Sequence, residues 1–394
     1  MAVESSALMA HAMHRAKAAW RCFSRAFTRE TRHAFRQPVI HWLCWCFPLI
    51  LFALIASNFS EGTLLDLPVS IVDNDHSKLS KELVRKLDAG SHAHVVAYAG
   101  GLPEAEHRLR TAQDYALLYI PPRFEADVLA GRQPSVVLYY NALFYGAGLY
   151  STQDFSGLMT ELNTRYRSII AAEIGKTVPS LASVDLSYGS LFNASGSYIY
   201  YQQFAATIHL LQLFTVTCMI YVMARSQALL AAPSFTFSLL GKLAPYTLCF
   251  TALLMVEIAL LVGVFDARVS GNPLDMLLIS FFYVIAAQSL GLLLFTFTST
   301  TISAYSMMAI FVGLALTFSG MAVPELSMPL PARIISEIEP LTHALNAMFD
   351  VFLRQVPSSR ILGVCAILLV YPLITGLLVH RKLYMRLKKQ EPGK

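Results

Sequence analysis

Charge is scarce in this sequence of 394 residues: Asp, Glu, Lys and Arg together make up 14%, against 55% hydrophobic residues. A soluble chain usually carries about 25% charged residues. The deficit excludes a disordered chain or a single soluble domain, and it indicates an integral membrane protein. Cysteine is absent from residues 60–200, so a domain there cannot rely on disulfide bonds. The six cysteines elsewhere lack the spacing of a metal site.

Six stretches are long and apolar enough to cross a bilayer, since about 20 helical residues span its hydrocarbon core. They cover residues 39–58, 204–224, 243–265, 276–297, 302–323 and 361–379. The first follows a long basic leader without a cleavage pattern, so we expect an anchor and not a removable signal. The sequence therefore predicts a polytopic α-helical membrane protein with six transmembrane helices.

Positive charge is concentrated at the two ends of the chain, in the leader (1–38) and the tail (381–394). Loop 225–242 adds Arg225 and Lys242 without an acid. Short basic loops stay in the cytoplasm, so we predict a multi-pass membrane protein with both termini cytoplasmic. The basicity reflects these membrane flanks and does not indicate a nucleic-acid partner.

The leader contains an amphipathic helix, expected at residues 18–36. One face carries Arg21, Arg25, Arg29, Arg32 and Arg36, and the opposite face carries Trp20, Phe23, Phe27 and Ala34. Such a helix lies in the membrane interface, with its arginines on lipid phosphates. It is either a plain basic flank that sets topology or an elbow helix that also contacts a cytoplasmic partner.

About 140 residues separate the first two spans, and segment 59–203 alternates between strand and helix patterns. Strands are expected at 67–72, 94–99, 115–120 and 135–140, and helices at 77–89, 102–112, 124–130 and 148–173. This alternation, outside the cytoplasm on the predicted topology, predicts an inserted α/β extracytoplasmic domain. The acidic and polar residues 73–77 are expected to form a turn and a helix cap.

No pattern indicates catalysis or nucleotide binding by this chain. Gly175-Lys176-Thr177 resembles the end of a phosphate-binding loop, but the required glycine is replaced by Ile170. No Ser/His/Asp or Cys/His set shares a depth in the membrane. We expect a chain that is not an enzyme and that has no catalytic residue, no metal and no cofactor of its own.

Glu257 is the one carboxylate expected well inside a span. A charge at that depth is costly, so the side chain should face the bundle interior or a cavity. His209, Gln212 and Gln288 are the other polar residues at depth and are candidates for a shared polar patch. The alternatives are hydrogen bonding between helices and a role in a substrate or proton path.

Four prolines break helicity in segment 324–343, near membrane depth. Irregular backbone cannot face lipid, so we expect an outer re-entrant segment of short helices, the alternative being a simple external loop. It would form an outer gate. The candidate gate residues are Pro324, Glu325, Glu337, Glu339 and His343.

Three stretches carry a resemblance to a known family. They are LPVSIVDNDHSKLSKELVRKLDAG (67–90), LLGKLAPY (239–246) and FSGMAVPELSMPLPARIISEIEPLTHALNAM (318–348). With an external domain after the first span and five spans following, the layout resembles an ABC-2 type permease of the bacterial drug- and polymer-exporter group. The resemblance implies a location in the bacterial inner membrane, with the external domain in the periplasm. It also implies a cytoplasmic ABC ATPase dimer, which binds ATP and Mg, and a second permease. In Gram-negative exporters of this layout the external domain often contacts a periplasmic adaptor protein.

The resemblance implies a permease subunit that forms the translocation path for an amphipathic or hydrophobic substrate. Candidate path residues, chosen by polarity and helix spacing, are Gln203, Phe204, His209, Phe214, Glu257, Tyr305, Met308, Phe311 and Phe318. Coupling to the ATPase is expected at Arg25, Arg29, Arg32, Arg225, Ser226 and Gln227. Loop 225–242 lacks the family's Glu and Gly-Thr, so one hypothesis makes this chain the degenerate half of a heterodimer. The alternatives are a membrane-anchored sensor or scaffold, and an intramembrane lipid-modifying enzyme.

Overall fold

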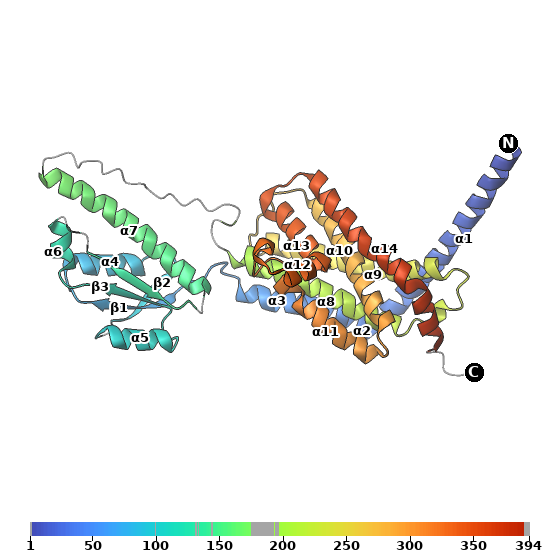
Figure 1. Cartoon of the computed structure of the whole chain (residues 1–394), viewed down its shortest axis with the longest axis horizontal. Coiled ribbons are helices and arrows are strands. Elements are labelled where there is room, and N and C mark those ends of the chain that lie inside the picture. Colours follow the sequence, from blue (N-terminus) through green and yellow to red (C-terminus); the bar gives the residue numbers. More distant parts are fainter. Residues whose placement is uncertain are drawn as a thin grey trace. The chain divides into compact units, whose positions relative to one another are not determined.

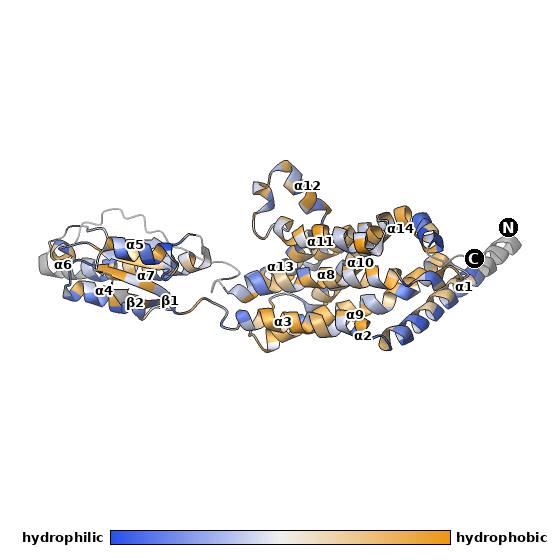
Figure 2. Ribbon diagram, turned by 90° about the horizontal axis from the view of Figure 1, so that it is seen from below, coloured by the Kyte–Doolittle hydropathy of each residue, from blue (hydrophilic) through white to orange (hydrophobic). Residues whose placement is uncertain are grey.

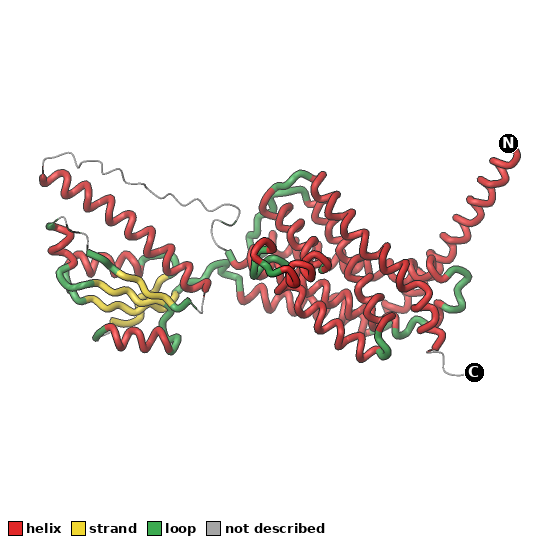
Figure 3. The backbone as a smooth tube through the Cα atoms, in the orientation of Figure 1, coloured by secondary structure: helices red, strands yellow, loops and turns green. Residues whose placement is uncertain are grey.

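The structure is a computed structural model that describes residues 2–98, 100–130, 132, 134–142, 145–174, 193 and 197–389. Gly175-Lys176-Thr177 lies outside these residues. The chain divides into two compact units, Met1–Ser60 with Ser190–Lys394, and Glu61–Gly189. Strands occur in the second unit, and the described part of the first is helical (Figure 3).

Within the described residues, six helical segments are long and apolar enough to cross a membrane, as predicted. The first runs through α2 (Pro38–His41), the π-helix η1 (Trp42–Cys46) and α3 (Phe47–Asn58), and the second through η2 (Ile199–Gln203) and α8 (Phe204–Met223). The others are α9 (Phe235–Gly263), α10 (Pro273–Phe297), α11 (Thr301–Phe318) and α14 (Ser358–Lys389). Apolar residues dominate these helices (Figure 2). The chain is therefore a polytopic helical membrane protein.

Four of the spans have ends that differ clearly from the predicted ones: the second span begins earlier, at Ile199, α14 continues to Lys389, and α9 and α11 differ as follows. Helix α9 begins at Phe235, so residues 235–242 are its first two turns and not part of a loop. Helix α11 ends at Phe318, because Gly320 follows with φ of 84°, a left-handed conformation that glycine adopts without strain. The only short element between α8 and α9 in this described stretch is a 3₁₀ turn, η3 (Gln227–Leu229).

Helix α8 forms the centre of the membrane-spanning unit and packs against α9, α10 and α11. Its residues Phe204, Val216, Cys218 and Met219 are inaccessible to solvent. The leader forms one long helix, α1 (Ala2–Phe35), which packs along α9. Helix α1 and the C-terminal turns of α14 lie at the same end of this unit (Figure 1).

The described residues between 61 and 174 form an α/β domain, which confirms the predicted insertion. Its strands are β1 (Leu67–Asp73), β2 (Ala93–Tyr98), β3 (Ala116–Ile120) and β4 (Val137–Tyr140), in the sheet order β2-β1-β3-β4. Strand β1 pairs in parallel with β2 and β3, and β4 pairs antiparallel with β3. Its helices are α4 (Lys78–Asp88), α5 (Leu102–Arg110), α6 (Phe124–Leu129) and α7 (Tyr145–Ile174).

The sheet of this domain is covered on both faces. Side chains of α4, α6 and α7 pack on one face around Ile71 and Leu118, and α5 packs on the other around Leu117. Ser77 caps α4 by accepting a hydrogen bond from the Ser80 amide at 3.0 Å. The Asp73 carboxylate accepts hydrogen bonds from two turn amides and from the Ser80 hydroxyl, so this acidic turn is held by its own backbone.

Segment 324–343 is built of short helices. After the 3₁₀ turn η4 (Glu325–Ser327), α12 (Leu330–Ile338) and α13 (Pro340–Phe349) follow, and the π-helix η5 (Asp350–Arg354) leads on to α14. Each of α12 and α13 begins beside a proline, where the missing N–H costs no helical hydrogen bond. Helix α13 packs against α8, α10 and α14.

Candidate functional site

The leader helix α1 and the third span α9 come into backbone contact at Gly241. A Cβ atom at this position would collide with the backbone carbonyl of Phe23. Only glycine allows the two helices to approach this closely. Gly241 belongs to the stretch 239–246, so this part of the sequence has a packing role at the junction of α1 and α9.

A buried ion pair fixes this junction. Lys242 Nζ lies 2.5 Å from a Glu30 carboxylate oxygen, and the two side chains are 8% and 7% exposed. The Tyr246 hydroxyl donates a hydrogen bond of 2.8 Å to the other Glu30 oxygen. Both carboxylate oxygens are therefore occupied, which is the condition under which a buried ion pair is tolerated. The arrangement ties α1 to the first two turns of α9.

The three arginines predicted to couple to an ATPase lie on the opposite side of α1. Arg25, Arg29 and Arg32 are exposed, and they border one recess of about 530 Å³ together with Arg36 and neighbouring polar residues of the same helix. Glu30 faces α9, whereas the face of α1 that carries these arginines does not contact α9. Helix α1 thus presents one apolar face with a buried acid, and one basic face suited to an acidic partner surface or to lipid phosphates.

The three loop residues predicted to couple differ in their accessibility. Arg225 is exposed, with its guanidinium 3.9 Å from the centre of the Tyr221 ring. Gln227 is exposed at the start of η3. Ser226 is 1% exposed and donates its hydroxyl hydrogen to the Val222 carbonyl, so it closes the end of α8 and does not reach the surface.

A second polar cluster joins the gate segment to the centre of the bundle. The Gln212 amide on α8 donates a hydrogen bond of 2.5 Å to Glu339, between α12 and α13. The Tyr283 hydroxyl on α10 lies 3.1 Å from both the Gln212 side-chain oxygen and the Ile208 carbonyl. Glu339 is 8% exposed, and burial raises the pKa of its carboxyl above the ordinary value. This cluster connects three elements that are far apart in the sequence.

The other predicted gate residues lie nearer the surface and form local contacts. The His343 ring donates a hydrogen bond of 2.9 Å to the Glu337 carbonyl when its Nε2 carries the proton. Glu337 is exposed and pairs with Arg333 one turn away on α12. Glu325 accepts a hydrogen bond from the Asn346 amide, which ties η4 to α13. Pro324 is exposed just before η4.

The predicted path residues of the second span are mostly buried within the chain. Gln203 and Phe204 are 1% and 0% exposed, and Phe204 stacks on Phe352 with ring centres 4.4 Å apart. Phe214 is 4% exposed and packs edge-on against Phe47 of the first span. Of the four, His209 is partly exposed. This part of α8 is therefore packing surface, apart from its side near His209.

The predicted path residues on α11 occupy two faces of that helix. Met308 is 9% exposed and accepts a hydrogen bond from Thr217 of α8, so it lies on the packed face. Phe311 is 53% exposed on the outer face, and Tyr305 and Phe318 are partly exposed. The outer face of α11 is a continuous apolar surface that no described part of this chain covers.

Glu257 on α9 is 4% exposed, but none of the hydrogen bonds or ion pairs among the described residues involves it. The predicted partners bond elsewhere: Gln212 to Glu339, and Gln288 to Thr247 at 2.8 Å. The structure does not assemble a polar patch around Glu257. A buried carboxylate without a partner is costly when charged, which favours its neutral form.

Sequence reasoning missed the Glu30, Lys242 and Tyr246 cluster and the role of Tyr283. A signal for the first was present, because Glu30 is the single acid between residues 5 and 60 and lies on the aromatic side of a helix with five arginines opposite. Lys242 is correspondingly the one cation at the start of an apolar span. Tyr283 gave no signal, since a tyrosine inside a span is most often ordinary packing.

Comparison with known families gives one match. The model of a family described as ABC-2 family transporter protein matches residues 39–380, which includes all six spans and the inserted domain. A search of curated proteins finds no match.

Proposed function

Because the chain belongs to the ABC-2 family of transporter proteins, we propose that this permease subunit of an ABC transporter exports an amphipathic or hydrophobic substrate. The observation that carries the proposal is the family match over nearly the whole chain, together with six spans and a domain inserted after the first. Membership of a transporter family favours this function over a sensor or a lipid-modifying enzyme. The energy comes from hydrolysis of ATP, which a separate ATPase dimer in the cytoplasm binds together with Mg.

The coupling surface consists of the exposed arginines of α1 with Arg225 and Gln227 at the end of α8. An ATPase that docks there and moves on binding ATP displaces α1. Helix α9 follows, because Glu30 and Lys242 form a buried ion pair and Gly241 leaves no space between the helices. The elbow and the third span therefore move as one body, and motion in the cytoplasm reaches the membrane core.

The translocation path is formed with a second permease against the outer face of α11. This face carries exposed Met307, Ile310, Phe311 and Leu314. Methionine and aromatic side chains suit variable apolar cargo, since they adapt their shape at little cost. The second permease is another copy of this chain or a related one, and the inserted domain is the surface available to a periplasmic adaptor.

The outer gate is the segment η4–α13, held to the bundle by Glu339. Its carboxylate contacts α8 through Gln212, and α8 lies beside α11, on which the path is formed. Rearrangement of α8 during the cycle would stretch or break this contact and release α12 and α13. The gate then opens in step with the path.

The test is transport by inside-out vesicles that contain this chain with its ATPase. Uptake of ethidium and flipping of a fluorescent phospholipid are measured with ATP, and with a non-hydrolysable analogue as control. We expect ATP-dependent transport that falls when Arg25, Arg29 and Arg32 are together changed to Gln, while the variant still inserts normally. Full transport by the triple variant would reject the coupling surface, and no ATP-dependent transport of any cargo tested would reject export.

The orientation is tested separately with a membrane-impermeant maleimide on intact cells. Single cysteines are introduced at exposed Glu104 in the inserted domain and at exposed Lys388 in the tail, in a chain whose native cysteines are replaced by alanine. We expect labelling at residue 104 in intact cells and at residue 388 only after lysis. The reverse pattern would overturn the orientation.

A further inference from the structure

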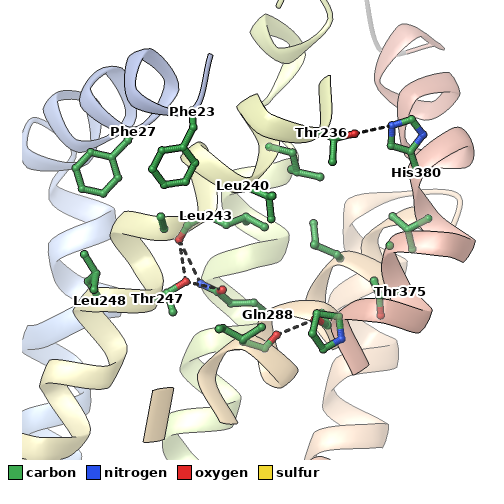
Figure 4. Close-up of a pocket in the computed structure, with 18 of the residues that line it drawn as sticks. Phe23, Phe27, Thr236, Leu240, Leu243, Thr247, Leu248, Gln288, Thr375 and His380 are labelled. Atoms are coloured by element: carbon green, nitrogen blue, oxygen red, sulfur yellow. Dashed lines mark hydrogen bonds between the residues drawn. The ribbon is translucent and has the colours of Figure 1, made fainter. Parts of the chain in front are cut away.

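A groove of about 620 Å³ opens on the surface of the membrane-spanning unit. It lies between α9, α10 and α14, and Phe23 and Phe27 of α1 form one of its walls (Figure 4). Two of its lining side chains, Leu240 and Leu248, are 50% and 55% exposed, which shows that the groove is open on the side away from the bundle centre. Most of the residues that line it are apolar, and leucine and phenylalanine are the commonest of these.

The length and position of the groove match one leaflet of a bilayer. On α9 it extends from Thr236 to Leu248, and twelve residues of helix rise about 18 Å. The hydrocarbon core is about 30 Å thick, so one leaflet contributes about half of that. The groove lies at the end of the unit where α1 packs and α14 carries its basic C-terminal turns. It therefore faces the leaflet on the side of the chain termini.

The polarity of the groove changes along its length as that of a phospholipid does. At its outer end the His380 ring and the Thr236 hydroxyl lie 3.1 Å apart, and the basic C-terminal turns of α14 begin at the next residue, exposed Arg381, which does not itself line the groove. At its deep end the polar groups satisfy one another, because Thr247 donates to the Gln288 side-chain oxygen at 2.8 Å. The deep part therefore needs neither water nor a polar ligand, whereas the outer end offers hydrogen-bonding and cationic groups to a phosphate.

We propose that this groove holds one phospholipid of the leaflet on the side of the termini. One acyl chain lies between α9, α10 and α14, against the aromatic side chains of α1, and the head-group phosphate lies at His380, beside the basic turns of α14. The bilayer surrounds the membrane-spanning unit wherever no other subunit covers it, so an acyl chain is available to fill an apolar recess at this depth. The lipid contacts both α1 and α14, two helices that make little direct contact with each other. The proposal does not depend on export or on any partner.

The glycines of α14 provide a matched pair of variants. Gly376 lines the groove, and a Cβ built on it meets no atom within 4 Å. Gly363 lies on the same helix outside the groove and has the same open space. Gly376→Phe therefore places a ring in the groove with no collision at its Cβ, and Gly363→Phe adds the same side chain elsewhere. Both changes remove a helical glycine, which favours the helix.

The experiment measures phosphatidylglycerol bound to the purified full-length chain by native mass spectrometry, after delipidation and titration. We expect one tightly held lipid per chain for the native protein and for Gly363→Phe, and at least tenfold weaker binding for Gly376→Phe. His380→Ala is expected to weaken binding about tenfold, as loss of a hydrogen bond to a charged phosphate does. This second variant decides the matter if Gly376→Phe does not fold.

Three results would overturn the proposal. The first is equal phosphatidylglycerol binding by Gly376→Phe and Gly363→Phe. The second is a delipidated native chain that binds no more phosphatidylglycerol than the detergent micelle carries non-specifically. The third is a change from dimer to monomer in Gly376→Phe without loss of lipid, which would make the groove an interface between copies of the chain.

Discussion

Replacing Glu30 by Gln leaves Lys242 buried beside α1 without a counter-charge. Removal of one partner from a buried ion pair costs about 3–5 kcal/mol, whereas removal of both is often close to neutral. Gln keeps an oxygen that accepts the Tyr246 hydrogen bond, so the charge is the main loss. We therefore expect Glu30→Gln and Lys242→Met each to weaken the docking of α1 on α9 by about 3–5 kcal/mol, and the double variant by only about 1 kcal/mol.

The assay is hydrogen–deuterium exchange of the backbone amides of α1 in the purified chain. Helix α1 must detach locally from α9 before its docked amides exchange. The protection of these amides therefore reports the free energy of that detachment. A cost of about 3–5 kcal/mol corresponds to exchange faster by two to three and a half orders of magnitude. Arg21→Gln, on the exposed face of the same helix, is the control and should change protection little.

The informative outcome is the departure from additivity between the two substitutions. If the double variant exchanges as fast as the sum of the single effects predicts, the two residues act independently and the ion pair does not hold α1. Unchanged protection in both single variants would show that apolar contacts alone fix the helix. Either result would also remove the basis for moving α1 and α9 as one body.

Three further outcomes follow from the structure. Gly241→Ala should displace α1 and abolish stimulation of the partner ATPase, because its Cβ meets α1 backbone, whereas Gly263→Ala on the same helix meets open space and should be silent in that assay. Burial raises the pKa of Glu339, so its contribution to stability is present below the ordinary carboxyl pKa of about 4.3 and is lost as pH rises through the raised value. The melting temperature of Glu339→Gln should therefore gain on that of the native chain as pH rises above the ordinary value, and a difference that stays constant with pH would contradict this. In the inserted domain, Arg108→Ala leaves Asp114 fully buried without its two 2.7 Å hydrogen bonds. The stability of the domain should fall by about 3–5 kcal/mol, and limited proteolysis of the full chain should cleave the domain faster. Arg110→Ala, exposed on the same helix, is the control.

The fold was predictable because its signals are local. Period-two and helical patterns, with Ser77 as a cap, placed the strands and helices of the inserted domain close to their observed positions. Hydropathy alone located six spans. The beginning of α9 was placed eight residues too late, because Lys242 interrupts the apolar run and its neutralising partner is Glu30, 212 residues earlier.

The candidate site was less predictable because its contacts join distant segments. Polarity singled out Gln212 and Glu339 as candidates, but the sequence could not show that these residues, 127 positions apart, bond to each other. It grouped Gln212 with Glu257, which the structure leaves without such a bond. Phe204 and Phe214, which were candidates for the path, are buried within the chain. The sequence could not show this, because their burial depends on how the helices pack.

The stretch 239–246 shows what a local motif can record about a distant contact. Gly241 provides the close approach, Lys242 the charge and Tyr246 the hydroxyl, and all three act on α1 within two turns of α9. None of them is needed for α9 to be a helix or to cross the membrane, and Lys242 works against insertion unless Glu30 is present. Their combination is therefore explained by the docking of the leader helix. A permease in which the leader moves with the third span needs such a motif, and one in which the leader merely lies on the bilayer does not.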